Sequence, residues 1–191
     1  VNGQNQFAIA IHGGAGAITK TNMTPELEKK YIEALNTALS IGENILKNGG
    51  SSMDAVEKTI IFLEDCPLFN AGKGAVYNNE GIHELDASIM DGKTLKAGAV
   101  ASLHHIKNPI LAARRVMEFS PHVFLAGPGA EKFAVEQGLD TVSNSYFDTP
   151  ERYDAYKKAK QINSKNPVDQ KKGTVGCVAL DQAGNLAAGT S

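Results

Sequence analysis

Residues 171–191 read KKGTVGCVALDQAGNLAAGTS, and this stretch decides the fold. Two apolar runs, Val175 to Leu180 and Leu186 to Ala188, are separated by a D-Q-A-G-N turn, which predicts a β-hairpin. Gly173 and Thr174 precede the first run, so a hydroxyl stands at the start of a buried strand. We expect the chain to end inside this hairpin, whose later strands are absent. An artificial cut here would expose unpaired strand edges, which favours a remainder on a separate chain.

The Gly173-Thr174 pair has two interpretations. A threonine beside a glycine at a strand start is most often a β-forming residue with a flexible neighbour. Alternatively, glycine leaves room for a strained peptide bond, and the Thr174 hydroxyl attacks the Gly173 carbonyl. Cleavage would give Thr174 a free α-amine, whose ordinary pKa of about 7.7 to 8 makes it a base near neutral pH. A threonine activated by its own amine is suited to acyl transfer.

Two amphipathic helices are expected in the first third of the chain. The Thr24-Pro25 pair supplies an N-cap and a first-turn proline, and apolar residues then recur every three or four positions until the Gly-Gly pair at 49–50. A serine at 51 or 52 caps a second helix through about Leu63. Before them, the run from Phe7 to Ile11 predicts a buried strand. These elements suggest one helical layer on a sheet.

The rest of the chain favours an α+β fold. Short apolar runs separated by N-N-E-G and D-G-K turn signals predict an antiparallel meander of three strands: Ala75–Tyr77, Leu85–Met90 and Ala97–Leu103. A helix from Asn108 to about Glu118, a strand or helix at His122 to Leu125, and a helix from Glu131 to Gln137 should follow. From Pro150 to Lys172 the sequence is highly charged, which predicts an exposed helix that fades into a mobile linker. Helices followed by antiparallel strands indicate α+β layering.

The composition excludes several classes of protein. With 191 residues, a net charge of −2 and 42% hydrophobic residues, the chain is a globular domain with a sizeable core. We expect no nucleic-acid partner, because long basic runs are absent. We expect no membrane association, because no apolar run reaches the length of about 18 residues that spans a bilayer. Cys66 and Cys177 are expected to be buried thiols. We expect the cytoplasm, because no signal peptide is visible. The first residue is Val1 instead of Met, so a removed export signal, and with it a periplasmic or secreted protein, stays open.

Two glycine-rich stretches are further candidates for a site. HGGAG, residues 12–16, can be an ordinary turn. Its glycines do not match a nucleotide-binding loop. It also does not indicate an esterase, because an esterase needs a G-x-S-x-G motif, which this sequence lacks. It remains a loop whose backbone can approach a reacting centre. LEDCPLFNAGKGAV, residues 63–76, can be a plain connection. Its main-chain carbonyls can also ligate sodium or potassium, and Asn70 can offer its amide to an oxyanion.

HELDASIMDG, residues 83–92, brings four metal-ligating side chains together. They are His83, Glu84, Asp86 and Asp91, and because H-x-x-x-H spacing is lacking we expect no transition-metal site. Strand alternation places Glu84 and Asp86 on one face, and Asp91 belongs to the turn.

Four stretches occur in one order and spacing: AIHGGAGAI, CPLFNAGKGAV, ELDASIMDGKTLKAGAVA with the following NPILAARRVME, and KKGTVGCVALDQAGNLAAGTS. Together they closely resemble the plant-type asparaginase / isoaspartyl peptidase family of N-terminal-nucleophile hydrolases, over nearly the whole chain. The resemblance implies an αββα sandwich. It also implies hydrolysis of L-asparagine to aspartate and ammonia, and of isoaspartyl (β-aspartyl) dipeptides, with no catalytic cofactor. Glycosylasparaginase, and an unprocessed homologue that serves as a binding or scaffold protein, remain alternatives.

The resemblance assigns roles to individual residues. Thr174 matches the self-cleaving residue and nucleophile, and Gly173 matches the last residue of the α subunit. Asn70 and Gly14 match positions that face the active site and support maturation. A structural sodium ion, or potassium, would be held by main-chain carbonyls of Leu63, Glu64, Cys66, Phe69, Ala71 and Lys73.

The resemblance also divides the chain. Residues 1–173 match the α-subunit region, with 150–172 as a mobile charged linker, and residues 174–191 match the start of the β subunit. Family members continue with a T-G-G stretch, an R-x-G-D-S stretch that holds the substrate's α-carboxylate and α-amine, and a Gly/Thr-rich oxyanion loop. We therefore expect the partner to be the β-subunit remainder of the same precursor, in an (αβ)2 heterotetramer. This chain alone is expected to be inactive.

Overall fold

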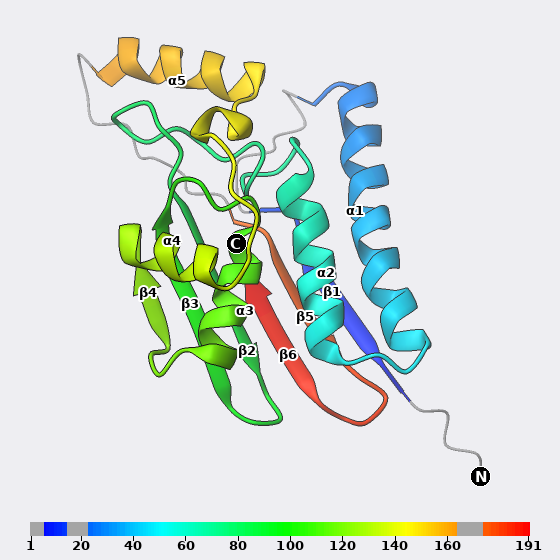
Figure 1. Ribbon diagram of the computed structural model, residues 1–191. Helices are drawn as coiled ribbons and strands as arrows, with labels where there is room; N and C mark the ends of the chain where they lie inside the picture. Colours follow the sequence, from blue (N-terminus) through cyan, green and yellow to red (C-terminus); the bar gives the residue numbers. More distant parts are fainter. Residues whose placement is uncertain (1–5, 15–22, 164–173) are drawn as a thin grey trace.

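The computed structural model, which describes residues 6–14, 23–163 and 174–191, places four helices against one face of a six-stranded sheet (Figure 1). A fifth helix, α5, lies beyond one end of the sheet. In chain order the elements are β1 (Ala8–His12), α1 (Pro25–Lys47), α2 (Ser52–Asp65), β2 (Leu85–Asp91), β3 (Lys96–Leu103), α3 (Pro109–Phe119), β4 (Phe124–Ala126), α4 (Gly127–Glu136), a 3₁₀ helix (Asn144–Phe147), α5 (Pro150–Asn163), β5 (Gly176–Leu180) and β6 (Leu186–Thr190). The α+β class is confirmed, and these elements correspond to one helical layer and one sheet of an αββα sandwich.

The hairpin of β5 and β6 lies in the middle of the sheet. The strand order is β1-β5-β6-β2-β3-β4, so each strand of the hairpin is paired on both sides. Neither edge of this hairpin is unpaired, because β1 and β2 flank it. Asp181 fixes the tight turn, since its carboxylate accepts the Asn185 N–H at 2.9 Å.

Both N-terminal helices begin where their capping residues predict. Thr24 Oγ1 accepts the Leu27 N–H at 3.2 Å, and Ser51 Oγ accepts the Asp54 N–H at 3.1 Å. Each bond satisfies one of the amide groups that a helix start leaves without a partner. The caps fix where α1 and α2 start, and the two helices then pack side by side over β1, β5 and β6 (Figure 1).

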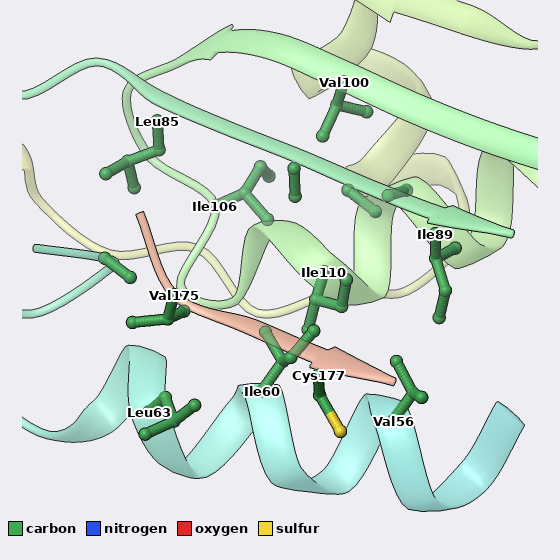
Figure 2. Close-up of a cluster of buried hydrophobic side chains, with 14 of the residues drawn as sticks. Val56, Ile60, Leu63, Leu85, Ile89, Val100, Ile106, Ile110, Val175 and Cys177 are labelled. Carbon is green, nitrogen blue, oxygen red and sulfur yellow. The ribbon is translucent and has the colours of Figure 1, made fainter. Parts of the chain in front are cut away.

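The core lies between α2, α3 and the inner face of the sheet (Figure 2). Each aliphatic side chain buried there stabilises the fold by about 1.5–3 kcal/mol. The side chains that meet in this layer are at most 2% exposed: Val56, Ile60 and Leu63 from α2, Ile110 from α3, and Ile89, Val100 and Cys177 from the sheet. The three α2 residues recur at helical spacing on one buried face, so the amphipathic character predicted for this helix is confirmed.

Helix α3 approaches β3 most closely at Gly98. A methyl group at this position would collide with the carbonyl oxygen of Ala113 and would lie 2.5 Å from the backbone nitrogen of Met117. Both atoms belong to the α3 backbone, which cannot rotate away as a side chain would. Only glycine permits this spacing between helix and sheet.

The other face of the sheet has no covering element among the described residues. Ala10, Val178, Ala188 and Met90 lie opposite one another in a row across four strands, and all four are exposed. Val178 is 50% exposed and Met90 43%. The prediction of a buried first strand is therefore wrong on this side, because β1 alternates between half-buried and exposed residues.

Several local predictions also differ from the structure. Ala75–Tyr77 is not a strand, and Tyr77 forms only a single bridge to His83. The segment expected to be a strand or a helix at His122 to Leu125 does contain a strand, Phe124–Ala126, but this strand pairs with β3 in parallel, across the α3 connection. The helix expected from Glu131 begins earlier, because the Gly-Pro-Gly sequence at 127–129 forms the first turn of α4, where proline is tolerated. The 3₁₀ helix at 144–147 was not expected.

The charged segment that begins at Pro150 is helical to Asn163, as predicted. The rest of the predicted linker, residues 164–172, lies outside the described residues. None of the helices in the described part of the chain combines the length and the hydrophobicity needed to cross a bilayer.

Candidate active site

Thr174 lies two residues before β5, at one end of the sheet, and is half-buried. The next residue, Val175, is fully buried. Its N–H donates to Ser191 O at 2.9 Å, and the Ser191 N–H and the Thr190 hydroxyl donate to Val175 O at 3.1 and 3.0 Å. These bonds fix the backbone beside the predicted nucleophile. Gly173, the other half of the predicted cleavage site, lies outside the described residues.

Gly14 lies against the backbone of Thr174. A methyl group on Gly14 would lie 3.4 Å from Thr174 O and 3.9 Å from Thr174 N. The Gly14 φ of +123° is a conformation that L side chains rarely adopt. The structure therefore brings the loop after β1 to the residue that the sequence singles out as the nucleophile.

A cavity of about 380 Å³ has Thr174 in its wall. This volume lies within the range of small-molecule sites. The lining comes from the loop after α2, the segment that leads into β2 and the residues next to β5 and β6: Asn70, Ala71, Gly72, Ala75, Val76, Tyr77, Asn78, Glu84, Leu85, Asp86, Thr174 and Ser191. Thr174 and Asn70, predicted from separate motifs, thus share one cavity.

Asn70 is oriented by the backbone of its own loop. Its Oδ1 accepts the Val76 N–H at 2.7 Å. With Oδ1 turned to that amide, the NH₂ group is the end of the Asn70 side chain that can donate to a developing negative charge. The same bond takes the Val76 amide out of any strand pairing, which explains why 75–77 is not a strand.

The loop after α2 packs main-chain carbonyl groups closely. Gly72 and Gly74 have φ of +47° and +114°. A side chain at Gly74 would lie 2.6 Å from Pro67 O and 2.7 Å from Phe69 O, and one at Gly72 would collide with Glu64 O. Both positions therefore require glycine, and the carbonyl oxygens of Glu64 and Phe69 point into a compact turn.

Two of the six carbonyl groups that the resemblance implies as sodium ligands, those of Leu63 and Glu64, retain lone pairs that can bind a cation. Leu63 O lacks its usual helical partner, because the residue four positions on is Pro67, which has no N–H. Glu64 O accepts the Lys73 N–H at 2.7 Å, and a carbonyl oxygen keeps a second lone pair for a cation. Neutral oxygens of this kind suit a hard monovalent or divalent cation.

The carboxyl group of Glu64 has a role that the sequence did not indicate. It is fully buried, and this burial raises the pKa of Glu64 to about 8. Its Oε1 accepts the Ile110 N–H at 2.9 Å in the first turn of α3, where Asn108 makes no side-chain capping bond. Glu64 thus caps α3 and ties that helix to the loop that carries Asn70.

The residues of HELDASIMDG do not form one cluster. Glu84 and Asp86 line the cavity, whereas His83 is fully buried. Asp91 accepts the Thr94 hydroxyl at 2.7 Å in the turn after β2. Within residues 6–14, 23–163 and 174–191, no three His, Cys, Asp or Glu side chains converge as in a metal site.

Neither cysteine belongs to the cavity wall. Cys177 is buried as predicted, and burial raises the pKa of its thiol to about 11. Cys66 is only half-buried, which corrects the prediction, and its pKa is also raised by desolvation. Thiols with raised pKa values are poor nucleophiles, so Thr174 is the better candidate in this region.

Comparison with known proteins gives one consistent result. A family model described as Asparaginase matches residues 5–191. The chain is 52% identical over 195 residues to an isoaspartyl peptidase from Salmonella typhimurium, covering 98% of this chain and 62% of the relative. An isoaspartyl peptidase from Escherichia coli K12 is also 52% identical, over 96% of this chain and 60% of the relative.

A human protein named isoaspartyl peptidase/L-asparaginase is 42% identical over 189 residues, which cover 98% of this chain and 60% of the relative. The chain therefore spans about 60% of the length of the curated relatives it matches.

Proposed function

Because the chain belongs to the asparaginase family, whose members are N-terminal-nucleophile hydrolases, we propose that Thr174 is the nucleophile of a threonine-dependent amidohydrolase. The proposed substrates are L-asparagine and isoaspartyl (β-aspartyl) dipeptides, in line with the names of relatives at 42–52% identity. The observation that carries the proposal is the cavity of about 380 Å³ that Thr174 and Asn70 share. Its size suits an amino acid or a dipeptide.

In the proposed maturation, the Thr174 hydroxyl attacks the Gly173 carbonyl carbon. The peptide C–N bond breaks, an ester forms between Gly173 and Thr174 Oγ, and the Thr174 nitrogen becomes a free amine. Water then hydrolyses the ester to a Gly173 carboxylate and the Thr174 hydroxyl. The freed amine lies on the same residue as that hydroxyl and can take its proton in each later turnover.

In the proposed turnover, Thr174 Oγ attacks the side-chain amide carbonyl of the substrate. The negative charge that develops on the carbonyl oxygen would be stabilised by the NH₂ group of Asn70, whose orientation the Val76 N–H fixes. Collapse of the intermediate expels ammonia, or the amine of the second residue of a dipeptide, with the transferred proton. Water then hydrolyses the aspartyl ester and releases aspartate.

We further propose that the uncovered face of the sheet packs against the β-subunit remainder of the same precursor. The exposed row that contains Val178 and Met90 supports this, because a soluble protein rarely leaves several large apolar side chains side by side in water. Phe124 and Leu186, on the same face, are 53% and 59% exposed. The proposed assembly is (αβ)2, and the remainder would supply the groups that hold the substrate's α-carboxylate and α-amine.

A single preparation tests function and assembly together. Protein made from the complete gene is expected to split into two fragments, the second beginning Thr174-Val175-Gly176 by N-terminal sequencing. The fragments should elute together at the mass of two copies of each, and the sample should hydrolyse asparagine and a β-aspartyl dipeptide. Amidase activity from an entirely unsplit chain would contradict the mechanism. Activity confined to glycosylated asparagine would assign the protein as a glycosylasparaginase.

For the loop between Leu63 and Lys73 we propose a structural sodium ion. An ion that binds only the folded state stabilises it, by about 2.7 kcal/mol when its concentration is a hundred times Kd. We expect the thermal midpoint of the full-length protein to be several degrees higher in sodium chloride than in choline chloride of equal ionic strength. Equal midpoints would contradict a sodium site, and a larger rise in potassium chloride would assign potassium.

The proposed compartment is the cytoplasm. Both cysteines are free thiols in the structure, as is usual where disulfides do not form. Fractionation of the source cells, with activity in the periplasmic or secreted fraction, would contradict it.

A further inference from the structure

A buried histidine lies directly behind the cavity wall. The His83 side chain is 0% exposed, and its ring is 4.1 Å from the ring of Tyr77. The His83 backbone is held by the Asn144 side chain, which accepts the His83 N–H at 3.0 Å and donates to its carbonyl at 2.9 Å. The ring therefore has little freedom to rotate.

Each ring nitrogen of His83 faces an oxygen that can only accept. Nδ1 lies 3.2 Å from Val76 O, and Nε2 lies 3.0 Å from Asp148 Oδ1. The Tyr77 hydroxyl donates to the same Asp148 oxygen at 2.8 Å, as expected for an ionised carboxylate. A neutral imidazole carries one proton and can satisfy only one of the two oxygens. Both contacts are hydrogen bonds only in the doubly protonated ring.

The Val76 peptide groups connect this pair to the site. The Val76 carbonyl faces His83 Nδ1, and the Val76 N–H donates to Asn70 Oδ1 at 2.7 Å. Val76 and Asn70 both line the cavity that contains Thr174. A change in the charge of His83 therefore reaches the Asn70 amide through a single residue.

We propose that protonated His83, paired with Asp148, is a positioning residue that holds Val76 and thereby orients Asn70 toward the cavity. The proposal rests on the proposed function of Thr174 and Asn70. When the ring loses one proton, the Asp148 carboxylate retains the Nε2–H, and the bare Nδ1 then faces Val76 O with a lone pair. The Val76 carbonyl oxygen then loses its hydrogen bond and is repelled by the Nδ1 lone pair. Val76 shifts as a result, and the Asn70 amide that its N–H holds loses its fixed orientation.

The titratable side chains in contact with the ring, among the described residues, are Asp148 and Tyr77. Burial and the neighbouring Asp148 raise the pKa of Tyr77 to about 12, so Tyr77 stays a neutral donor near neutral pH. The change of charge that matters for the proposal is that of the His83 ring, whose two nitrogens face Val76 O and Asp148 Oδ1.

Two substitutions in the full-length protein separate this role from a purely structural one. In Asp148→Asn the new amide can donate to Nε2, so that neutral His83 keeps its proton on Nδ1 and holds Val76 at every pH. In His83→Phe the ring shape remains but both hydrogen bonds are lost. Asp140→Asn and His122→Gln, at exposed positions, are the matched controls for the lost charges.

We expect His83→Phe to lower kcat by about tenfold or more at every pH, with KM changed less than twofold, because misplacement of a reacting group costs turnover. The kcat of Asp148→Asn should match the wild type at low pH and exceed it increasingly, by several-fold, as the pH rises, because the neutral ring of this variant still holds Val76. The two control variants should follow the wild-type profile. Wild-type kcat and pH profile in His83→Phe would overturn the proposal.

NMR of the Thr174→Ala variant gives a readout that needs no activity. Nitrogen-15 shifts should show both His83 ring nitrogens protonated at low pH, and the Asn70 NH₂ signal should move as that ring titrates, but not in the double variant with Asp148→Asn. A singly protonated ring throughout, or an Asn70 signal insensitive to the titration, would overturn the proposal. An inactive, uncleaved wild type would instead refute the proposed function.

Discussion

Replacement of Thr174 by alanine leaves the full-length protein unsplit and lowers its amidohydrolase turnover by about 10⁴-fold or more. Removal of a covalent nucleophile typically costs this much or more, because the remaining groups stabilise a transition state that can no longer form. Here one substitution removes the hydroxyl from both the cleavage step and the turnover step. Gel electrophoresis of the purified protein and initial rates on a β-aspartyl dipeptide measure the two losses separately.

Thr174→Ser is the matched control, because it keeps the hydroxyl and, after cleavage, the free amine. It should split more slowly than the wild type and retain measurable turnover. The fold should be intact in both variants, since Thr174 is only half-buried and the neighbouring Val175 supplies the buried contact. An alanine variant that still splits, or that hydrolyses the dipeptide at the wild-type rate, would remove Thr174 from the mechanism.

Replacement of Gly98 by alanine lowers the free energy of unfolding by about 3 kcal/mol, at the upper end of typical overpacking costs. The added methyl would meet the α3 backbone at Ala113 and Met117, so the whole helix must move away from β3. That shift would loosen the layer in which Ile110 packs against the sheet (Figure 2). Denaturant unfolding of the full-length protein measures the loss.

Gly129→Ala is the control for this substitution. Gly129 lies in the first turn of α4, and a methyl group there would have no atom within 4 Å. Its unfolding free energy should stay the same or rise by less than about 1 kcal/mol, because alanine favours a helix over glycine. A Gly98→Ala protein as stable as the Gly129→Ala protein would show that α3 and β3 tolerate a wider spacing.

The parts of the fold that depend on neighbouring residues were predictable from the sequence. Thr24 and Ser51 mark the helix starts, and the Asp181 turn marks the hairpin, because each acts within a few positions of the chain. The central position of the hairpin was not predictable, since sheet order depends on contacts between distant segments. The strand expected at Ala75–Tyr77 fails because the Asn70 side chain takes the Val76 amide.

The candidate site was also predictable only in part. Motifs within single stretches pointed to Thr174, Asn70 and Gly14, and the structure brings all three to one end of the sheet. His83 and Asp148 are 65 positions apart, and nothing in their local sequence indicates that they meet. The 3₁₀ helix that precedes Asp148 and the loop that ends at His83 create this pair only in three dimensions.

The central position of β5 and β6 has a consequence for the proposed cut before Thr174. The strands downstream of the cut separate β1 from β2, so the strands of the upstream fragment, β1 and β2 to β4, do not form a continuous sheet by themselves. Cleavage there would create a free amino terminus without separating the fragments. Their separation would require the loss of two antiparallel strand pairings, β1 with β5 and β2 with β6. Synthesis as one polypeptide therefore matters, because all six strands can pair before the proposed cleavage. An upstream fragment synthesised separately would have a gap in its sheet between β1 and β2.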